Sequence, residues 1–137
     1  MDDIIHARQH DLEDALFIPN SATIVGCGGV GTWVAIALAL GGTSNMTLVD
    51  MDTVAIHNLN RLPYPPSFVG RNKAEALKAF LLTMRPSMLI ISQPHAIQDI
   101  LGIVPLDRDV YCCTDTLASQ KLLYDYSNNR FMYRKVG

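Results

Sequence analysis

The chain has 137 residues, of which 49% are hydrophobic and 18% are charged. Eleven Lys and Arg residues against thirteen Asp and Glu residues leave a formal net charge of -2. This composition excludes a disordered chain, and the slight acidity argues against binding to nucleic acid or to an anionic membrane surface. We expect a single domain over residues 1–137, with an N-terminal helical segment over 1–19 and an α/β core over 20–137.

The sequence also bears on compartment. It begins Met1-Asp2-Asp3, which lacks the basic start of a signal peptide. Its longest unbroken apolar run, Trp33 to Leu40, is much too short to span a bilayer. We therefore expect a cytoplasmic protein with no membrane partner. The three cysteines, one of them unpaired by count and none in a C-x-x-C motif, indicate reduced thiols.

The first predicted elements are a helix over residues 2–16, a strand over 22–25 and a helix over 30–40. A glycine-rich turn joins the strand to the second helix, and Gly41-Gly42 is expected to end that helix. The second helix is apolar nearly all round. We therefore expect it to be sandwiched between the sheet and other elements, with Trp33 in the core.

A second strand over 46–49 leads to Asp50, and regular periodicity is absent from 51 to 70, where prolines indicate a long functional connection. A helix over about 71–84, strands over 88–91 and 110–113, a helix over 117–126 and a strand over 131–136 follow. Apolar strands that alternate with helices predict a Rossmann-like α/β fold, with a mainly parallel sheet and helices on both faces. Because the chain stops directly after a predicted core strand, we expect it to be truncated at the C-terminus relative to a longer protein.

The run Gly26-Cys27-Gly28-Gly29-Val30-Gly31 lies between the predicted first strand and second helix. Glycines allow a sharp turn and a close approach of a phosphate, and the helix start presents unpaired N–H groups and the positive end of its dipole. Asp50 follows Gly31 by nineteen residues at the end of the next strand, where a carboxylate can accept hydrogen bonds from a ribose. These features predict nucleotide binding and fit dinucleotide enzymes and adenylating enzymes alike.

Polar groups further along the chain favour a triphosphate. They stand at strand ends or at a helix start, in the segments Asp50–Asp52, Asn58–Arg61, Gly70–Lys73 and Thr114-Asp115. In an open α/β sheet such positions converge on one crevice. Two cations and three carboxylates around a phosphate loop suit a metal-bound triphosphate better than a nicotinamide dinucleotide.

The joint pattern resembles that of the ubiquitin-activating-enzyme-like adenylyltransferases, the family of ThiF, MoeB and HesA. The resemblance covers about residues 20–118 and consists of G-x-G-G-x-G, Asp-x-Asp, Asn-Leu-x-Arg, Gly-x-x-Lys and a later strand-ending Asp. It implies an ATP- and Mg²⁺-dependent enzyme that adenylates the C-terminal carboxylate of a small ubiquitin-like or sulfur-carrier protein, usually ending Gly-Gly, and releases pyrophosphate. It also implies a homodimer.

The resemblance further implies residue roles. Arg61, Lys73 and Asp115 would be catalytic, with Asp115, helped by Asp52, placing the magnesium ion. Arg8 would reach the nucleotide of the partner subunit. The full set of implied nucleotide-binding residues is Gly26, Gly28, Gly29, Gly31, Asp50, Asp52, Asn58, Arg61, Lys73 and Arg8.

Two features found in many members of that family have no counterpart in this sequence: a thioester-forming cysteine well beyond the magnesium aspartate, and two C-x-x-C zinc pairs. The pattern therefore supports adenylation and gives no support for thiol transfer or zinc binding. Two alternatives stay open. One is an NAD-dependent oxidoreductase, which would leave Arg61, Lys73 and Asp115 without a role. The other is a non-catalytic nucleotide-binding or scaffold module of the same fold.

Overall fold

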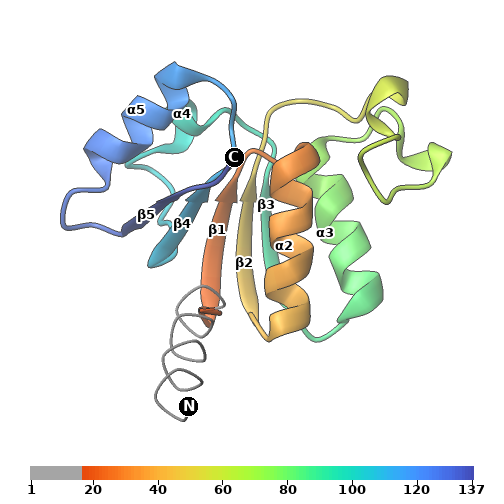
Figure 1. Cartoon of the computed structure of the whole chain (residues 1–137), viewed down its shortest axis with the longest axis horizontal. Coiled ribbons are helices and arrows are strands. Elements are labelled where there is room, and N and C mark those ends of the chain that lie inside the picture. Colours follow the sequence, from red (N-terminus) through yellow and green to blue (C-terminus); the bar gives the residue numbers. More distant parts are fainter. Residues whose placement is uncertain (1–16) are drawn as a thin grey trace, which may run out of the picture.

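The computed structural model describes residues 17–137. In this part of the chain five strands form one parallel sheet in the order β3-β2-β1-β4-β5. Helices α2 and α3 cover one face of the sheet, and α4 and α5 cover the other (Figure 1). The predicted Rossmann-like α/β fold is confirmed. The strands are β1 (Ser21–Val25), β2 (Asn45–Val49), β3 (Leu89–Gln93), β4 (Asp109–Cys112) and β5 (Met132–Lys135), and the helices are α2 (Gly29–Gly41), α3 (Lys73–Met84), α4 (Ile97–Ile100) and α5 (Leu117–Tyr126).

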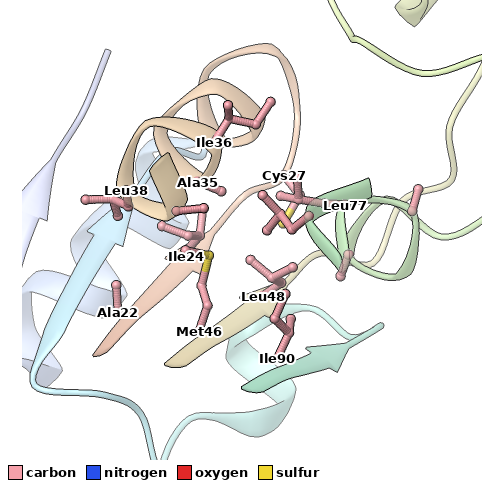
Figure 2. Close-up of a cluster of buried hydrophobic side chains, with 14 of the residues drawn as sticks. Ala22, Ile24, Cys27, Ala35, Ile36, Leu38, Met46, Leu48, Leu77 and Ile90 are labelled. Atoms are coloured by element: carbon pink, nitrogen blue, oxygen red, sulfur yellow. The ribbon is translucent and has the colours of Figure 1, made fainter. Parts of the chain in front are cut away.

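Two hydrophobic cores explain why the strands are apolar along their length. Successive strand residues point to opposite faces, so Ile24 packs with α2 and α3, whereas Val25 packs with α4 and α5. Figure 2 shows Ile24, Met46 and Leu48 of the sheet beneath the two larger helices. Helices thus cover both faces of the central strands, which is the usual condition of a parallel sheet.

The strand order creates a crevice at the carboxyl ends of the central strands. From β1 the chain runs outward through β2 to β3, and then crosses back to place β4 on the other side of β1. The connections that follow β1 and β4 therefore leave toward opposite faces of the sheet. Ligands of open α/β sheets bind at this kind of switch point.

The glycine end predicted for the second helix is also confirmed. Gly42 has a φ of 120°, and its N–H donates to the carbonyls of Leu38 and Ala39 at 3.1 and 3.3 Å. Such a left-handed glycine satisfies carbonyl groups that the last helical turn leaves free.

The helix was expected to be sandwiched between the sheet and other elements, but part of its surface is exposed. Val30 is 44%, Trp33 50% and Leu40 70% exposed. The reason lies in the layers of the fold: within residues 17–137, α2 packs on the sheet beside α3, and no further helix covers its outer side (Figure 1). An apolar sequence alone does not show which elements surround it.

Other differences are smaller. Helix α4 was not predicted, because four residues are too few to show a helical period. The connection over 51–70 contains two short 3-10 turns, η1 (Ile56–Asn58) and η2 (Pro66–Phe68). The helix predicted over 2–16 lies outside the described residues. Among residues 17–137 no helix is long and apolar enough to cross a membrane.

Candidate active site

A cavity of about 990 Å³ opens at the carboxyl ends of the strands. Its wall is formed by the glycine loop, the residues after β2, the 58–62 segment, the start of α3, the β3–α4 connection and the start of α5. This volume is at the upper end of the range for small-molecule sites, which is roughly 300–1,000 Å³. The cavity lies at the switch point of the sheet.

The glycine loop brings three chain segments into close contact. Gly26 has a φ of 94°, and a Cβ atom there would lie 2.8 Å from the backbone nitrogen of Thr114. A Cβ atom at Gly31 would lie 1.7 Å from the carbonyl oxygen of Gly26. A Cβ atom at Gly28, by contrast, would meet nothing within 4 Å. The outer glycines thus allow close packing, while Gly28 borders open space in the cavity wall.

Helix α2 begins at this loop without a side-chain cap. Its first N–H groups have no helical carbonyl partner and carry the positive end of the dipole. The helix start therefore offers the donors that a bound phosphate needs.

Asp50 connects the loop to the segment after β2. Its Oδ2 accepts the N–H of Cys27 at 2.7 Å, and its Oδ1 accepts the N–H of Asp52 at 2.8 Å. Each carboxylate oxygen has a further lone pair, and the residue lines the cavity, so it can accept another hydrogen bond. Burial raises the pKa of Asp50 above 3.8, and the two backbone N–H groups oppose part of that rise.

The raised pKa of Asp50 predicts a pH dependence of stability. The folded protein holds the proton more tightly than the unfolded chain, so the stabilising contribution of Asp50 is complete below pH about 4 and is lost as pH rises through the raised pKa. Relative to Asp50→Asn, the wild-type protein should therefore lose unfolding free energy as the pH rises from about 4, the unfolded-state pKa, through the raised folded-state pKa. Urea unfolding of both proteins over this range measures the difference. A wild-type protein that gains on the variant with rising pH would contradict the assignment.

Arg61 lies against the glycine loop. A Cβ atom built on Gly29 would be 3.7 Å from both Cβ and Cδ of Arg61. Asn58, three residues earlier, uses its Oδ1 to accept the N–H of Ala55 at 2.9 Å, which holds the preceding turn. The amide NH₂ group of Asn58 can therefore serve a ligand in the cavity, while its oxygen is already engaged.

Lys73 is the first residue of α3 and lines the same cavity. Its position is set by Asn72, whose Oδ1 accepts the N–H groups of Ala74 and Glu75. The Nδ2 of Asn72 donates to the carbonyl oxygens of Asp50 at 2.8 Å and Asp52 at 3.2 Å. One side chain thus caps α3 and ties it to the segment after β2. An asparagine directly before a helix is the sequence signal for this cap.

Replacement of Asn72 by alanine should lower the free energy of unfolding by about 1–2 kcal/mol, because α3 loses its cap. Asn72→Ser is the matched variant, since its hydroxyl oxygen keeps an acceptor for the helix N–H groups and the donor to the two carbonyls is lost without added charge. We expect Asn72→Ser to recover most of the loss, measured by urea unfolding. Equal stability of the alanine variant and the wild-type protein would show that the cap contributes nothing.

Asp115 follows β4 and is exposed in the cavity wall. No group of three or more His, Cys, Asp or Glu side chains that could hold a metal ion occurs among residues 17–137. The single carboxylate of Asp115 still fits Mg²⁺, because this ion is commonly held by one or two carboxylates together with substrate phosphates and waters.

The cavity collects most of the residues that the sequence singled out. Gly31 is buried in α2 and does not line the cavity, and Arg8 lies outside the described residues. Those in the wall are Gly26, Gly28, Gly29, Asp50, Asp52, Asn58, Arg61, Lys73 and Asp115. Their placement in one cavity follows the prediction, whereas their chemical roles stay predictions.

Several lining residues were not anticipated. Trp33 was expected in the core, which is wrong: it is 50% exposed and forms part of the cavity wall. His95 and Gln98 enter the wall from the β3–α4 region, which carried no recognisable motif. Cys113 also lines the cavity, but burial raises the pKa of its thiol to about 12, so it is protonated and a poor nucleophile at neutral pH.

Comparison with known proteins identifies the family of this chain. The sequence model described as "ThiF family" matches residues 4–132. The chain belongs to the ThiF family. A domain of this family therefore accounts for the glycine loop, the parallel sheet and the polar cluster in one cavity.

Curated relatives of this ThiF-family chain include enzymes that act on different substrates. It is 40% identical over 70 residues to ubiquitin-like modifier-activating enzyme 5 of Caenorhabditis elegans, covering 51% of this chain and 17% of that protein. It is 34% identical over 103 residues to molybdopterin-synthase adenylyltransferase of Escherichia coli K12, covering 73% of this chain and 41% of that protein. The chain thus spans less than half the length of either relative.

A solved structure supports the same family. The E. coli tRNA N6-threonylcarbamoyladenosine dehydratase TcdA in complex with ATP matches with a TM-score of 0.75 and 27% identity. The match covers 91% of this ThiF-family chain and 54% of the TcdA chain. The fold described here is therefore that of a protein solved with a bound nucleotide.

Proposed function

We propose that this chain binds ATP with Mg²⁺ and adenylates the C-terminal carboxylate of a small ubiquitin-like or sulfur-carrier protein that ends in Gly-Gly. The observation that carries the proposal is the convergence of the glycine loop with Arg61, Lys73 and Asp115 in one cavity. The ATP complex of the related TcdA supports the choice of nucleotide. The names of the two curated relatives support the type of reaction and of acceptor.

The proposed reaction forms a bond between a carboxylate oxygen and the α-phosphorus of ATP and breaks the bond from that phosphorus to the pyrophosphate oxygen. Negative charge increases on the leaving pyrophosphate. Arg61 and Lys73 would stabilise this charge, and Asp50 would hold the ribose. The residue suited to hold Mg²⁺ is Asp115, and the ion would neutralise phosphate charge when bound.

The charges of the cavity favour a triphosphate over NAD. Within residues 17–137, the ion pairs that form are Lys121–Asp125 and Arg134–Asp109, so the cations of Arg61 and Lys73 are not consumed by a carboxylate there. NAD carries fewer phosphate charges than ATP, so it would offer less negative charge for these two side chains to bind. An NAD-dependent oxidoreductase therefore remains the weaker candidate.

Binding and catalysis can be tested separately. Trp33 is the sole tryptophan of the sequence and lies on the cavity wall, so its fluorescence should respond to Mg-ATP and not to NAD. At a ligand concentration 100 times Kd, binding should add about 2.7 kcal/mol to the free energy of unfolding. Exchange of labelled pyrophosphate into ATP, with a panel of Gly-Gly-ending carrier proteins, measures adenylation. Binding without exchange for every carrier would favour a non-catalytic nucleotide-binding module.

The quaternary structure belongs to the same proposal. We expect a cytoplasmic homodimer in which Arg8 reaches the nucleotide of the partner subunit. Light scattering on the purified chain measures the mass, and mixing Arg8→Ala with a variant inactive at Lys73 tests the shared site. Full activity of Arg8→Ala would remove Arg8 from the proposed site.

A further inference from the structure

Trp33 occupies an unexpected place for a large apolar side chain. It lies in the second turn of α2, is 50% exposed and forms part of the cavity wall. Its indole Nε1–H donates to the backbone carbonyl oxygen of Arg61 at 2.8 Å. The bond joins residues 28 positions apart, one on the phosphate-loop helix and one on the long connection after β2.

We propose that Trp33 is a positioning residue that acts through Arg61, an inference that rests on the proposed adenylation. The indole N–H fixes the backbone of Arg61 against α2. The side chain of Arg61 then extends from a fixed backbone position beside Gly29. Its Cβ and Cδ atoms are both 3.7 Å from the position of a Cβ atom built on Gly29. Its guanidinium group is thereby held on the side of the cavity where the helix start offers phosphate donors.

A hydrogen bond of this kind can help to order Arg61, because an arginine side chain is long and flexible. A free arginine side chain loses rotamer entropy when it is ordered, and a small displacement of a charge-stabilising group lowers the rate strongly. When the Arg61 backbone is fixed, the side chain has fewer conformations to lose when it binds the phosphates in the transition state. The exposed position of Trp33, which packing does not require, agrees with a role at the site.

Other contacts also hold the loop, so its folding does not depend on this bond alone. Leu62 and Tyr64, directly after Arg61, are 7% and 6% exposed. Tyr64 packs on Phe68 and Phe80 with ring centroids 5.2 and 5.7 Å apart. The N–H of Arg61 also donates to Asn58 at 3.0 Å. Loss of the indole donor should therefore move Arg61 without unfolding the connection.

The test uses Trp33→Phe, which keeps an aromatic ring and removes the N–H donor, in the 137-residue chain. Leu40→Ala is the matched control, because Leu40 is an exposed apolar residue of the same helix that does not line the cavity. We expect Trp33→Phe to lower kcat for ATP–pyrophosphate exchange about tenfold, with a smaller change in KM for ATP. We expect faster amide hydrogen exchange at Arg61 in Trp33→Phe and no change of either quantity in Leu40→Ala.

A double-mutant cycle with Arg61→Ala separates positioning from general stability. If Trp33 acts through the Arg61 side chain, Trp33→Phe should cause no further loss of kcat in the Arg61→Ala background. The carbonyl of residue 61 is present in both backgrounds, so the loss of thermal stability should be the same in both.

The outcomes distinguish the two proposals. A tenfold loss in both backgrounds, or unchanged kcat in Trp33→Phe, overturns the positioning role and leaves the proposed function intact. A wild-type chain that binds no Mg-ATP and exchanges no pyrophosphate overturns the proposed function, and the role of Trp33 with it.

Discussion

Replacement of Lys73 by alanine is expected to lower the rate of ATP–pyrophosphate exchange by about 10²–10³, equivalent to about 3–4 kcal/mol of transition-state stabilisation. Lys73 begins α3 in the cavity wall, where its charge can meet the phosphates. Arg61→Ala should give a loss of the same order. Initial rates at saturating ATP and carrier protein measure the effect.

The Lys73→Ala substitution should not lower the free energy of unfolding, although it lowers the rate. A cation at a helix start opposes the dipole by about 0.3–1 kcal/mol, so the variant should be as stable as the wild-type protein or slightly more stable when nucleotide is absent. Lys78→Ala is the control, since Lys78 lies on the same helix and outside the cavity wall. Wild-type exchange rates in both Lys73→Ala and Arg61→Ala would remove the adenylation proposal.

Replacement of Gly31 by alanine is expected to have the largest structural effect of any single methyl group in the loop. The added Cβ would lie 1.7 Å from the carbonyl oxygen of Gly26, which is backbone and cannot rotate away. Either the loop or the start of α2 must move. We expect a loss of about 3 kcal/mol in the free energy of unfolding, or roughly 10 °C in Tm, together with loss of Mg-ATP binding.

Gly28→Ala is the control for Gly31→Ala, because it adds the same methyl group at a position with open space. A methyl group at Gly28 meets nothing within 4 Å, so it should cost less than about 1 kcal/mol in stability. It extends into the space proposed for the phosphates, so Mg-ATP affinity should still fall. Calorimetric unfolding and ligand titration of both variants measure these quantities. Equal stability of Gly28→Ala and Gly31→Ala would show that the close approach at Gly31 is not what the loop requires.

Much of the fold was predictable because its signals are local. The order of strand, glycine loop and helix depends on residues that are neighbours in the chain, as does the glycine end of α2. The cap at Asn72 is a signal of the same kind. Helix α4 escaped prediction because its four residues cannot display a period.

The candidate site was predictable in its members but not in its contacts. Because strand ends and helix starts converge at one edge of such a sheet, Asp50, Lys73 and Asp115 were expected to lie together, and all three line one cavity. Nothing local indicated that Asn72 would donate to the Asp50 carbonyl, or that the Trp33 indole would reach Arg61. These bonds join residues 22 and 28 positions apart, and their partners follow from packing.

The sequence by itself determined which segments become strands and helices and which polar residues stand at their ends, because these choices rest on short-range sterics, hydrogen bonding and periodicity. Only the tertiary structure decided which side of α2 meets solvent and which side chain holds the Arg61 segment in place. An apolar helix buries a face only where another element covers it. In the described part of the chain no element covers the outer side of Trp33, which is half exposed in the cavity wall.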